Sequence, residues 1–172
     1  MGRPYKELTP EVRKDKAKEQ KKLTPTTVDE VLKILWDNYY AVLKIDSPRK
    51  WGRVSYSKIV KSSGIDDKKN IIWIKFAKEE GNESDKRYVG TVGAGSDINN
   101  HWDYENMSGM LVNHAGLVWD DSLVLVIPVR LQDGKKRDDF EKAIGNLLLG
   151  NKIPIIDYYS HDFGLFIKEK SE

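Results

Sequence analysis

The sequence contains no cysteine in its 172 residues. This absence excludes a disulfide framework, thiolate metal sites and cysteine nucleophiles. It is also typical of a cytoplasmic protein, because disulfides are rare in the cytosol. A metal site would therefore depend on carboxylates and on the three histidines of the chain.

Long apolar runs are missing too. The longest, LVLVIPV at residues 123–129, is far too short to cross a bilayer. Residues 1–22 contain no apolar stretch of the kind that defines a secretory signal. With 39% hydrophobic and 33% charged residues, the composition is that of a well-solvated globule. We therefore expect an intracellular, cytoplasmic protein without a membrane partner.

The patterns of common catalytic sites are also missing. The glycines at residues 90–96 are spaced G-x-x-G-x-G with no lysine after them, which matches neither phosphate-binding fingerprint. Asp120 and Asp121 precede an apolar strand, but the second acid that metal-dependent nuclease chemistry needs is missing. The Ser-His-Asp run at 160–162 places its side chains on different faces, and no G-x-S-x-G elbow is present. The sequence favours a protein that is not an enzyme and that needs no cofactor.

Helical spacing of apolar residues predicts the helices. A helix is expected over 27–44, with Thr27 as its N-cap and Tyr39 on its apolar stripe, which Trp36 and Tyr40 widen. Two more helices are expected over 55–63 and over 135–149, the latter closed by Gly150.

Runs of β-branched and aromatic residues predict strands over 70–77, 87–95, 122–131, 153–160 and 163–168. Pro128 removes a ladder donor from one of them, which suggests an edge strand or a bulge. We expect an α+β fold: one domain over 26–172, a mixed and mostly antiparallel sheet of about five strands, and two to three helices.

Residues 1–25 are interpreted as a charged N-terminal tail. Residues 11–22 have acids and lysines at helical spacing but almost nothing to bury, so a helix there would fray without a surface to lie on. That surface could be the chain's own body, a partner chain, nucleic acid or a crystal neighbour.

Charge is divided into blocks along the chain. Residues 1–24 have eight Lys or Arg against four acids, residues 44–78 have ten against three, and residues 79–121 have two against nine. In 44–61 the cations alternate with aromatic residues, a pattern typical of nucleic-acid contact. The predicted nucleic-acid-binding residues are Arg3 of the N-terminal Gly-Arg-Pro, Lys44, Arg49, Lys50, Trp51, Arg53, Tyr56, Lys58 and Lys61. The alternative is a solvated basic face whose Trp51 packs on the core.

The segment 96–121 contains two histidines and several acids with little periodicity. Asp97, His101, Asp103 and His114 are the types of ligand that Zn²⁺, Mn²⁺ or Fe²⁺ accept, although their spacing is not diagnostic. We favour the interpretation as a polar loop whose side chains cap backbone groups. The aromatic and methionine residues of this segment also suit a protein interface, or they are core: Trp102, Tyr104, Met107, Met110 and Trp119.

Three functions remain open from the sequence. We expect a non-enzymatic protein that contacts nucleic acid, or a nucleic-acid machine, through its basic tail and segment 44–61. The first alternative is a metal-dependent hydrolase or nuclease centred on residues 97–114. The second is a protein that binds or inhibits another protein.

Overall fold

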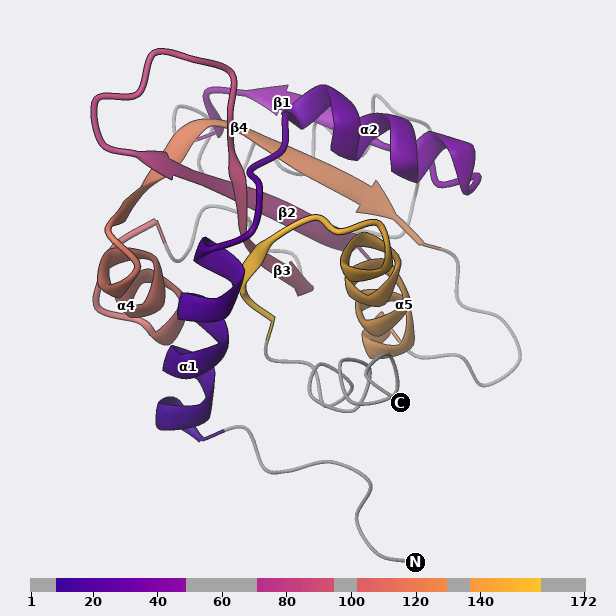
Figure 1. Ribbon diagram of the computed structural model, residues 1–172. Helices are drawn as coiled ribbons and strands as arrows, with labels where there is room; N and C mark the ends of the chain where they lie inside the picture. Colours follow the sequence, from indigo (N-terminus) through magenta and orange to yellow (C-terminus); the bar gives the residue numbers. More distant parts are fainter. Residues whose placement is uncertain (1–8, 49–70, 95–101, 130–136, 159–172) are drawn as a thin grey trace, which may run out of the picture.

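Five strands form one sheet at the centre of the molecule. The computed structural model describes residues 9–48, 71–94, 102–129 and 137–158 of the chain (Figure 1). The strands are β1 (Leu43–Asp46), β2 (Ile71–Glu79), β3 (Tyr88–Ala94), β4 (Leu117–Pro128) and β5 (Ile155–Asp157), in the sheet order β1-β4-β2-β3-β5. All neighbours are antiparallel except β3 and β5, which are parallel. The predicted α+β fold with a mixed, mostly antiparallel sheet is confirmed.

Four helices of the described residues cover the two faces of this sheet. They are α1 (Pro10–Lys21), α2 (Val28–Asp37), α4 (Met107–His114) and α5 (Arg137–Gly150). The side chains of a strand alternate between faces, and β2 separates its residues accordingly. Ile71, Trp73 and Ala77 pack with α1 and α4, whereas Ile72, Ile74 and Phe76 pack with α2 and α5. Figure 1 shows α1 beside α4 at the lower left, away from α2 at the upper right.

The strand predictions at the centre of the sheet are confirmed. Every residue from 71 to 77 is buried, as the apolar run of β2 predicts, and β2 pairs with β3 on one side and β4 on the other. β4 begins at Leu117, five residues before the predicted start at 122. Pro128 is the last residue of β4, and β1 pairs no further along β4 than Val126, so β1 needs no amide donor from this proline.

Residues 10–21 of the predicted tail form a helix that packs on the domain. Thr9 caps α1 by accepting a hydrogen bond from the Val12 amide, and Ala17 is fully buried. Gln20 Oε1 accepts a hydrogen bond of 2.8 Å from the amide of Ile155 on the edge strand β5. The surface on which this helix lies is therefore the chain's own body. Residues 1–8 lie outside the described part.

The predicted helix over 27–44 is correct only in its first part. Thr27 caps α2 by accepting from the Glu30 amide at 3.1 Å, but the helix ends at Asp37. Residues 43–46 form β1 instead, an edge strand whose Ile45 is buried and lies opposite Val124 of β4. The apolar pattern continued past the helix because an edge strand, rather than a further helical turn, buries these residues.

A short helix that the sequence pattern did not predict lies in the segment interpreted as a loop. Asn106 Oδ1 accepts from the Gly109 amide and so caps α4. A Cβ on Gly109 would come within 2.0 Å of the carbonyl oxygen of Asp103, so only glycine fits there. Glycine weakens the helical signal, and for that reason the pattern looked irregular.

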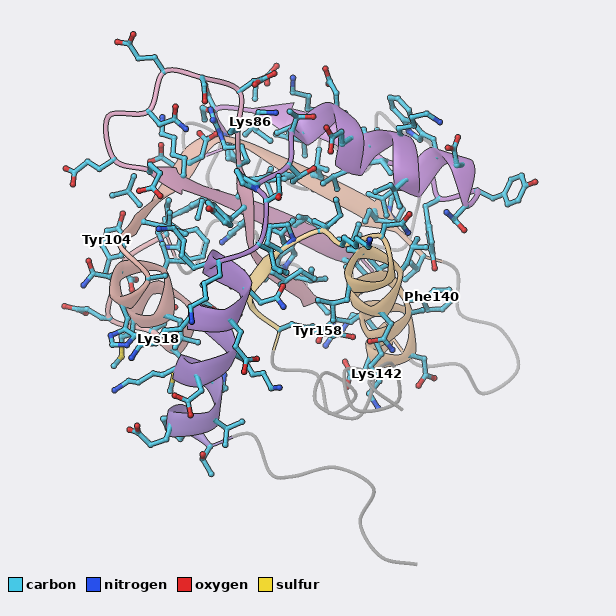
Figure 2. The ribbon with its side chains drawn as sticks, in the orientation of Figure 1. Lys18, Lys86, Tyr104, Phe140, Lys142 and Tyr158 are labelled. Carbon is cyan, nitrogen blue, oxygen red and sulfur yellow. The ribbon has the colours of Figure 1, made fainter. Side chains whose placement is uncertain are left out.

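The C-terminal helix and strand agree with the prediction in position. α5 spans Arg137–Gly150. Tyr158, the residue after β5, contacts this helix: its hydroxyl donates to the carbonyl oxygen of Lys142 at 2.8 Å (Figure 2). The predicted helix over 55–63 and strand over 163–168 lie outside the described residues. Within the described ranges, the structure contains no helix of the length and apolarity that crossing a membrane requires.

Candidate nucleic-acid interface

One of the nine predicted nucleic-acid-binding residues lies in the described part of the chain. Lys44 is exposed on the edge strand β1. The other eight, Arg3 and seven residues between 49 and 61, lie outside it. The segment 49–61 contains five cations and no acid, and it begins three residues after β1 ends.

Two exposed aromatic residues precede this basic segment in the sequence. Tyr39 is 97% exposed and Trp36 is 56% exposed, more than any other large hydrophobic side chain among the described residues. Both were expected on the buried stripe of the helix, and that prediction is wrong. Figure 1 shows that α2 lies apart from α1 and α4.

The backbone at the end of α2 explains why Tyr39 points to solvent. The Tyr40 amide donates to the Leu35 carbonyl and the Tyr39 amide donates to the Trp36 carbonyl, both at 3.0 Å. This pair of hydrogen bonds is a Schellman motif, in which the residue after the C-cap takes a left-handed conformation. Tyr39 is that residue, with φ of 67°, while Tyr40 packs back toward the core beside Leu35. Burial also raises the pKa of Tyr40, which keeps its hydroxyl neutral.

Two other helices of the described residues are also followed by a residue in the left-handed conformation, and these residues are not aromatic. After α4 the left-handed position is Gly116, with φ of 78°, and after α5 it is Lys152, with φ of 63°. Glycine is the usual residue because it has no Cβ to clash, and an exposed lysine favours the negative end of a helix. A tyrosine offers neither advantage. Tyr39 therefore combines a left-handed backbone with an almost fully exposed ring.

Replacing Tyr39 with glycine is expected to stabilise the protein by about 0.5 to 1 kcal/mol. The left-handed strain disappears, and almost no buried surface is lost because the ring is 97% exposed. Urea unfolding measures the difference. Lys152→Gly, at the equivalent position after α5, is the matched control and should gain a similar amount. A loss of stability for Tyr39→Gly would show that the ring supports the fold.

Charges near the aromatic pair are balanced within the described residues. Lys33 and Asp37 of α2 form an exposed ion pair at 2.6 Å, and Lys44 of β1 lies two residues from Asp46. The end of α2 therefore supplies aromatic surface without an excess of positive charge. A polyanion would have to obtain its cations from the basic segment that follows β1.

The lysines of α1 are mostly paired. Their partners are Glu11 for Lys14, Glu19 for Lys16 and Glu79 for Lys21, while Arg13 binds Asp157. Lys18 and Lys22 are exposed and form no ion pair with the described residues (Lys18 is labelled in Figure 2). The helix thus offers a polyanion less free charge than its count of cations indicates.

The residues of the metal hypothesis are only partly described. Asp103 Oδ1 accepts hydrogen bonds from the Glu105 amide and from two nitrogens of Asn106, so it orders the turn before α4. His114 is the exposed last residue of α4. Asp97 and His101 lie outside the described residues, and inside them no group of three or more potential ligands converges. Of the four residues, Asp103 is the one whose side chain accepts hydrogen bonds from backbone groups in the described part of the chain.

The residues of the protein-interface hypothesis divide between core and surface. Trp102 and Trp119 are buried and meet edge to face, with centroids 6.0 Å apart. Tyr104 is 41% exposed, and its hydroxyl accepts from the Trp119 amide at 3.1 Å (Figure 2). Met110 is 44% exposed and Met107 is partly buried. The described part of this segment therefore supplies side chains both to the core and to the surface.

Comparison with protein-family models, with curated proteins and with solved structures finds no match to this chain.

Proposed function

We propose that the protein is a non-enzymatic binding protein for single-stranded nucleic acid. The contact is made by Trp36 and Tyr39 at the end of α2 together with Lys44 and the basic segment 49–61. One observation carries the proposal: an exposed tyrosine in a left-handed position follows an exposed tryptophan by three residues and precedes a segment with five cations by ten residues.

Stacking and charge supply the two parts of such binding. Every base has a π-face, so exposed rings bind single strands with little sequence preference. Cations of the basic segment neutralise phosphates and release counterions. Paired bases in a duplex are stacked on each other and give an exposed ring no face to bind, so the aromatic pair favours single strands over duplexes.

The proposal is tested by fluorescence anisotropy with a labelled single-stranded oligonucleotide. Six cations at residues 44–61 predict a slope of log K against log salt of about −4, at −0.7 for each phosphate. Trp36→Ala and Tyr39→Gly should each weaken binding by about 1 to 3 kcal/mol, or roughly 5- to 150-fold. Tyr39→Gly would then be the more stable protein and the weaker binder.

Two charge reversals locate the contact. Arg49→Glu with Lys50→Glu should remove most of the affinity. Lys18→Glu with Lys22→Glu makes the same change of charge on α1, which packs on the opposite face of the sheet from α2. If both double variants lose the same amount of affinity for the oligonucleotide, the contact is not centred on the basic segment. Binding that is absent, or insensitive to salt, would contradict the proposal and favour a protein partner for the aromatic pair.

A further inference from the structure

The two edges of the sheet differ in what the described residues place against them. At the β5 edge, α1 packs alongside the strand, and Gln20 Oε1 accepts the amide hydrogen of Ile155 at 2.8 Å. At the β1 edge, no described segment pairs with the strand on the side away from β4 (Figure 1). An unpaired edge strand presents backbone N–H and C=O groups to which another strand can bind.

The pairing of β1 with β4 shows which backbone groups of β1 point outward. The Ser47 amide donates to the carbonyl oxygen of Ser122 at 2.7 Å, so these residues form a hydrogen-bonded pair of the antiparallel ladder. Hydrogen-bonded and non-hydrogen-bonded pairs alternate along such a ladder, and Ile45 is therefore the next residue of β1 that bonds to β4. The N–H and C=O groups of Lys44 and Asp46 point away from β4.

The two residues with outward backbone groups also have opposite charges. The side chains of Lys44 and Asp46 are exposed, and neither takes part in an ion pair among the described residues. A lone lysine on an edge strand discourages pairing with another copy. An acid two residues further along changes this. If two copies pair antiparallel about a two-fold axis at Ile45, Lys44 of each copy lies opposite Asp46 of the other.

We propose that two copies of this chain associate through their β1 strands, which pair antiparallel about a two-fold axis at Ile45 and join the two sheets. The next registers in which the outward groups can bond are shifted by two residues. They place Lys44 opposite Lys44 of the second copy, or Asp46 opposite Asp46. Opposite charges on paired strands stabilise a sheet and like charges destabilise it, so the charges favour the register centred on Ile45.

The β1 edge is short, so the contact is weak. The outward groups of Lys44 and Asp46 can form about four backbone hydrogen bonds between the two copies. Interfaces of this small size are typical of transient association, which needs a high protein concentration. The inference goes beyond the proposed function, and Lys44 is the one residue that both use. Association is therefore measured without nucleic acid, and its absence would leave the proposed nucleic-acid contact in place.

Sedimentation equilibrium of charge variants tests the proposal. Lys44→Glu makes both charges of the β1 edge acidic and Asp46→Lys makes both basic, so each variant should associate at least about tenfold more weakly than the wild type. An equimolar mixture of the two variants should dimerise again, because each acid then lies opposite a lysine. The double variant Lys44→Glu with Asp46→Lys exchanges the two charges and should also restore association.

The matched control reverses the charges of an exposed ion pair at the other edge of the sheet. Lys16 and Glu19 form such a pair on α1, which packs beside β5. Lys16→Glu and Glu19→Lys should leave the dimerisation constant unchanged, both alone and when mixed. If this control pair behaves like the β1 variants, the association is a general attraction between charged surfaces and the inference is wrong.

Cross-linking locates the two-fold axis, because the chain has no cysteine of its own. In the proposed register the two copies of Ile45 form a non-hydrogen-bonded pair with Cα atoms about 4.5 Å apart, which is within the range of a disulfide. Ile45→Cys should therefore form a disulfide-linked dimer when glutathione disulfide is the oxidant. Leu43→Cys is the control, because the two introduced thiols would lie about 14 Å apart along the strands.

Three results would overturn the inference. One is a mixture of Lys44→Glu and Asp46→Lys that associates no better than either variant alone. Another is equal cross-linking of Ile45→Cys and Leu43→Cys. The third is a wild-type protein that stays monomeric at high concentration. Hydrogen exchange would then give the reason: protected amides at Lys44 and Asp46 would mean that another segment of the same chain covers the edge, and unprotected amides would mean an open edge.

Discussion

Replacing Arg13 with leucine is expected to lower the free energy of unfolding by about 3 to 5 kcal/mol. The guanidinium group binds both carboxylate oxygens of Asp157, with Nη2 at 2.7 Å from Oδ2 and Nε at 3.0 Å from Oδ1. The Asp157 side chain is 1% exposed, so the variant leaves a buried carboxylate with one strong donor, the Ser108 hydroxyl at 2.6 Å. A buried charge that loses its partner is among the costliest defects in a folded protein.

Urea unfolding monitored by circular dichroism measures this loss. Lys16→Leu is the control on the same helix, because its partner Glu19 is 62% exposed and the pair should contribute less than about 1 kcal/mol. The double variant Arg13→Leu with Asp157→Asn should recover part of the loss, since no buried charge remains. If Arg13→Leu costs less than about 1 kcal/mol, the ion pair does not anchor α1 to β5.

The same ion pair shows what the sequence could not predict about the N-terminus. Helical spacing indicated a helix at 11–22, but α1 has few large apolar residues with which to pack. Its docking depends on a contact between residues 144 positions apart, and no local pattern contains that information. The helix was therefore predictable and its place on the domain was not.

The central strands were predictable because their burial is a local property of the sequence. β2 is apolar at six of its first seven positions, and the structure buries all seven. The spacing of apolar residues does not identify the element where a helix and a strand would bury the same types of residue. Val42 and Leu43 continue the helical spacing of α2, yet they lead into and begin the edge strand β1. Nothing in the apolar pattern distinguishes an added helical turn from a short edge strand.

Local sequence pattern also failed to predict how two of the notable side chains are placed. Tyr39 fits the helical stripe by spacing, but the chain turns one residue earlier, at Asn38. Asparagine tolerates the end of a helix better than its interior, and it was the available signal of that turn. Lys75 was predictable as a strand residue. The burial of Lys75 against the indole rings of Trp73 and Trp102 was not predictable, because Trp102 comes from a segment without a regular pattern.

The second large effect concerns Asp120, and it depends on pH. Asp120 is 3% exposed on β4, where Arg87 Nε donates to it at 2.7 Å and Ser122 donates through both its amide and its hydroxyl. Burial by itself raises the pKa of this carboxyl, but the hydrogen bonds from Ser122 and Arg87 outweigh burial, and the pKa lies below its ordinary value of 3.8. The folded protein therefore prefers the ionised form.

Asp120→Asn is expected to cost about 2 to 3 kcal/mol at pH 7, because the charge-assisted hydrogen bonds are lost and Arg87 keeps only carbonyl partners. A carboxyl whose pKa is lowered by folding stabilises the folded protein at any pH above its pKa in the unfolded chain, which is about 3.9. This stabilisation is lost as the pH falls through the pKa of the carboxyl in the folded protein. The stability gap between wild type and variant should thus be constant above about pH 5 and narrow in acid.

Chemical unfolding at a series of pH values from neutral to acid measures this gap. Asp85→Asn changes the same charge on an exposed residue of the β2–β3 connection and should shift stability by less than about 0.5 kcal/mol. A gap that widens as the pH falls would mean that Asp120 is protonated more readily in the folded protein. Burial would then outweigh the hydrogen bonds from Arg87 and Ser122 in setting the pKa of Asp120.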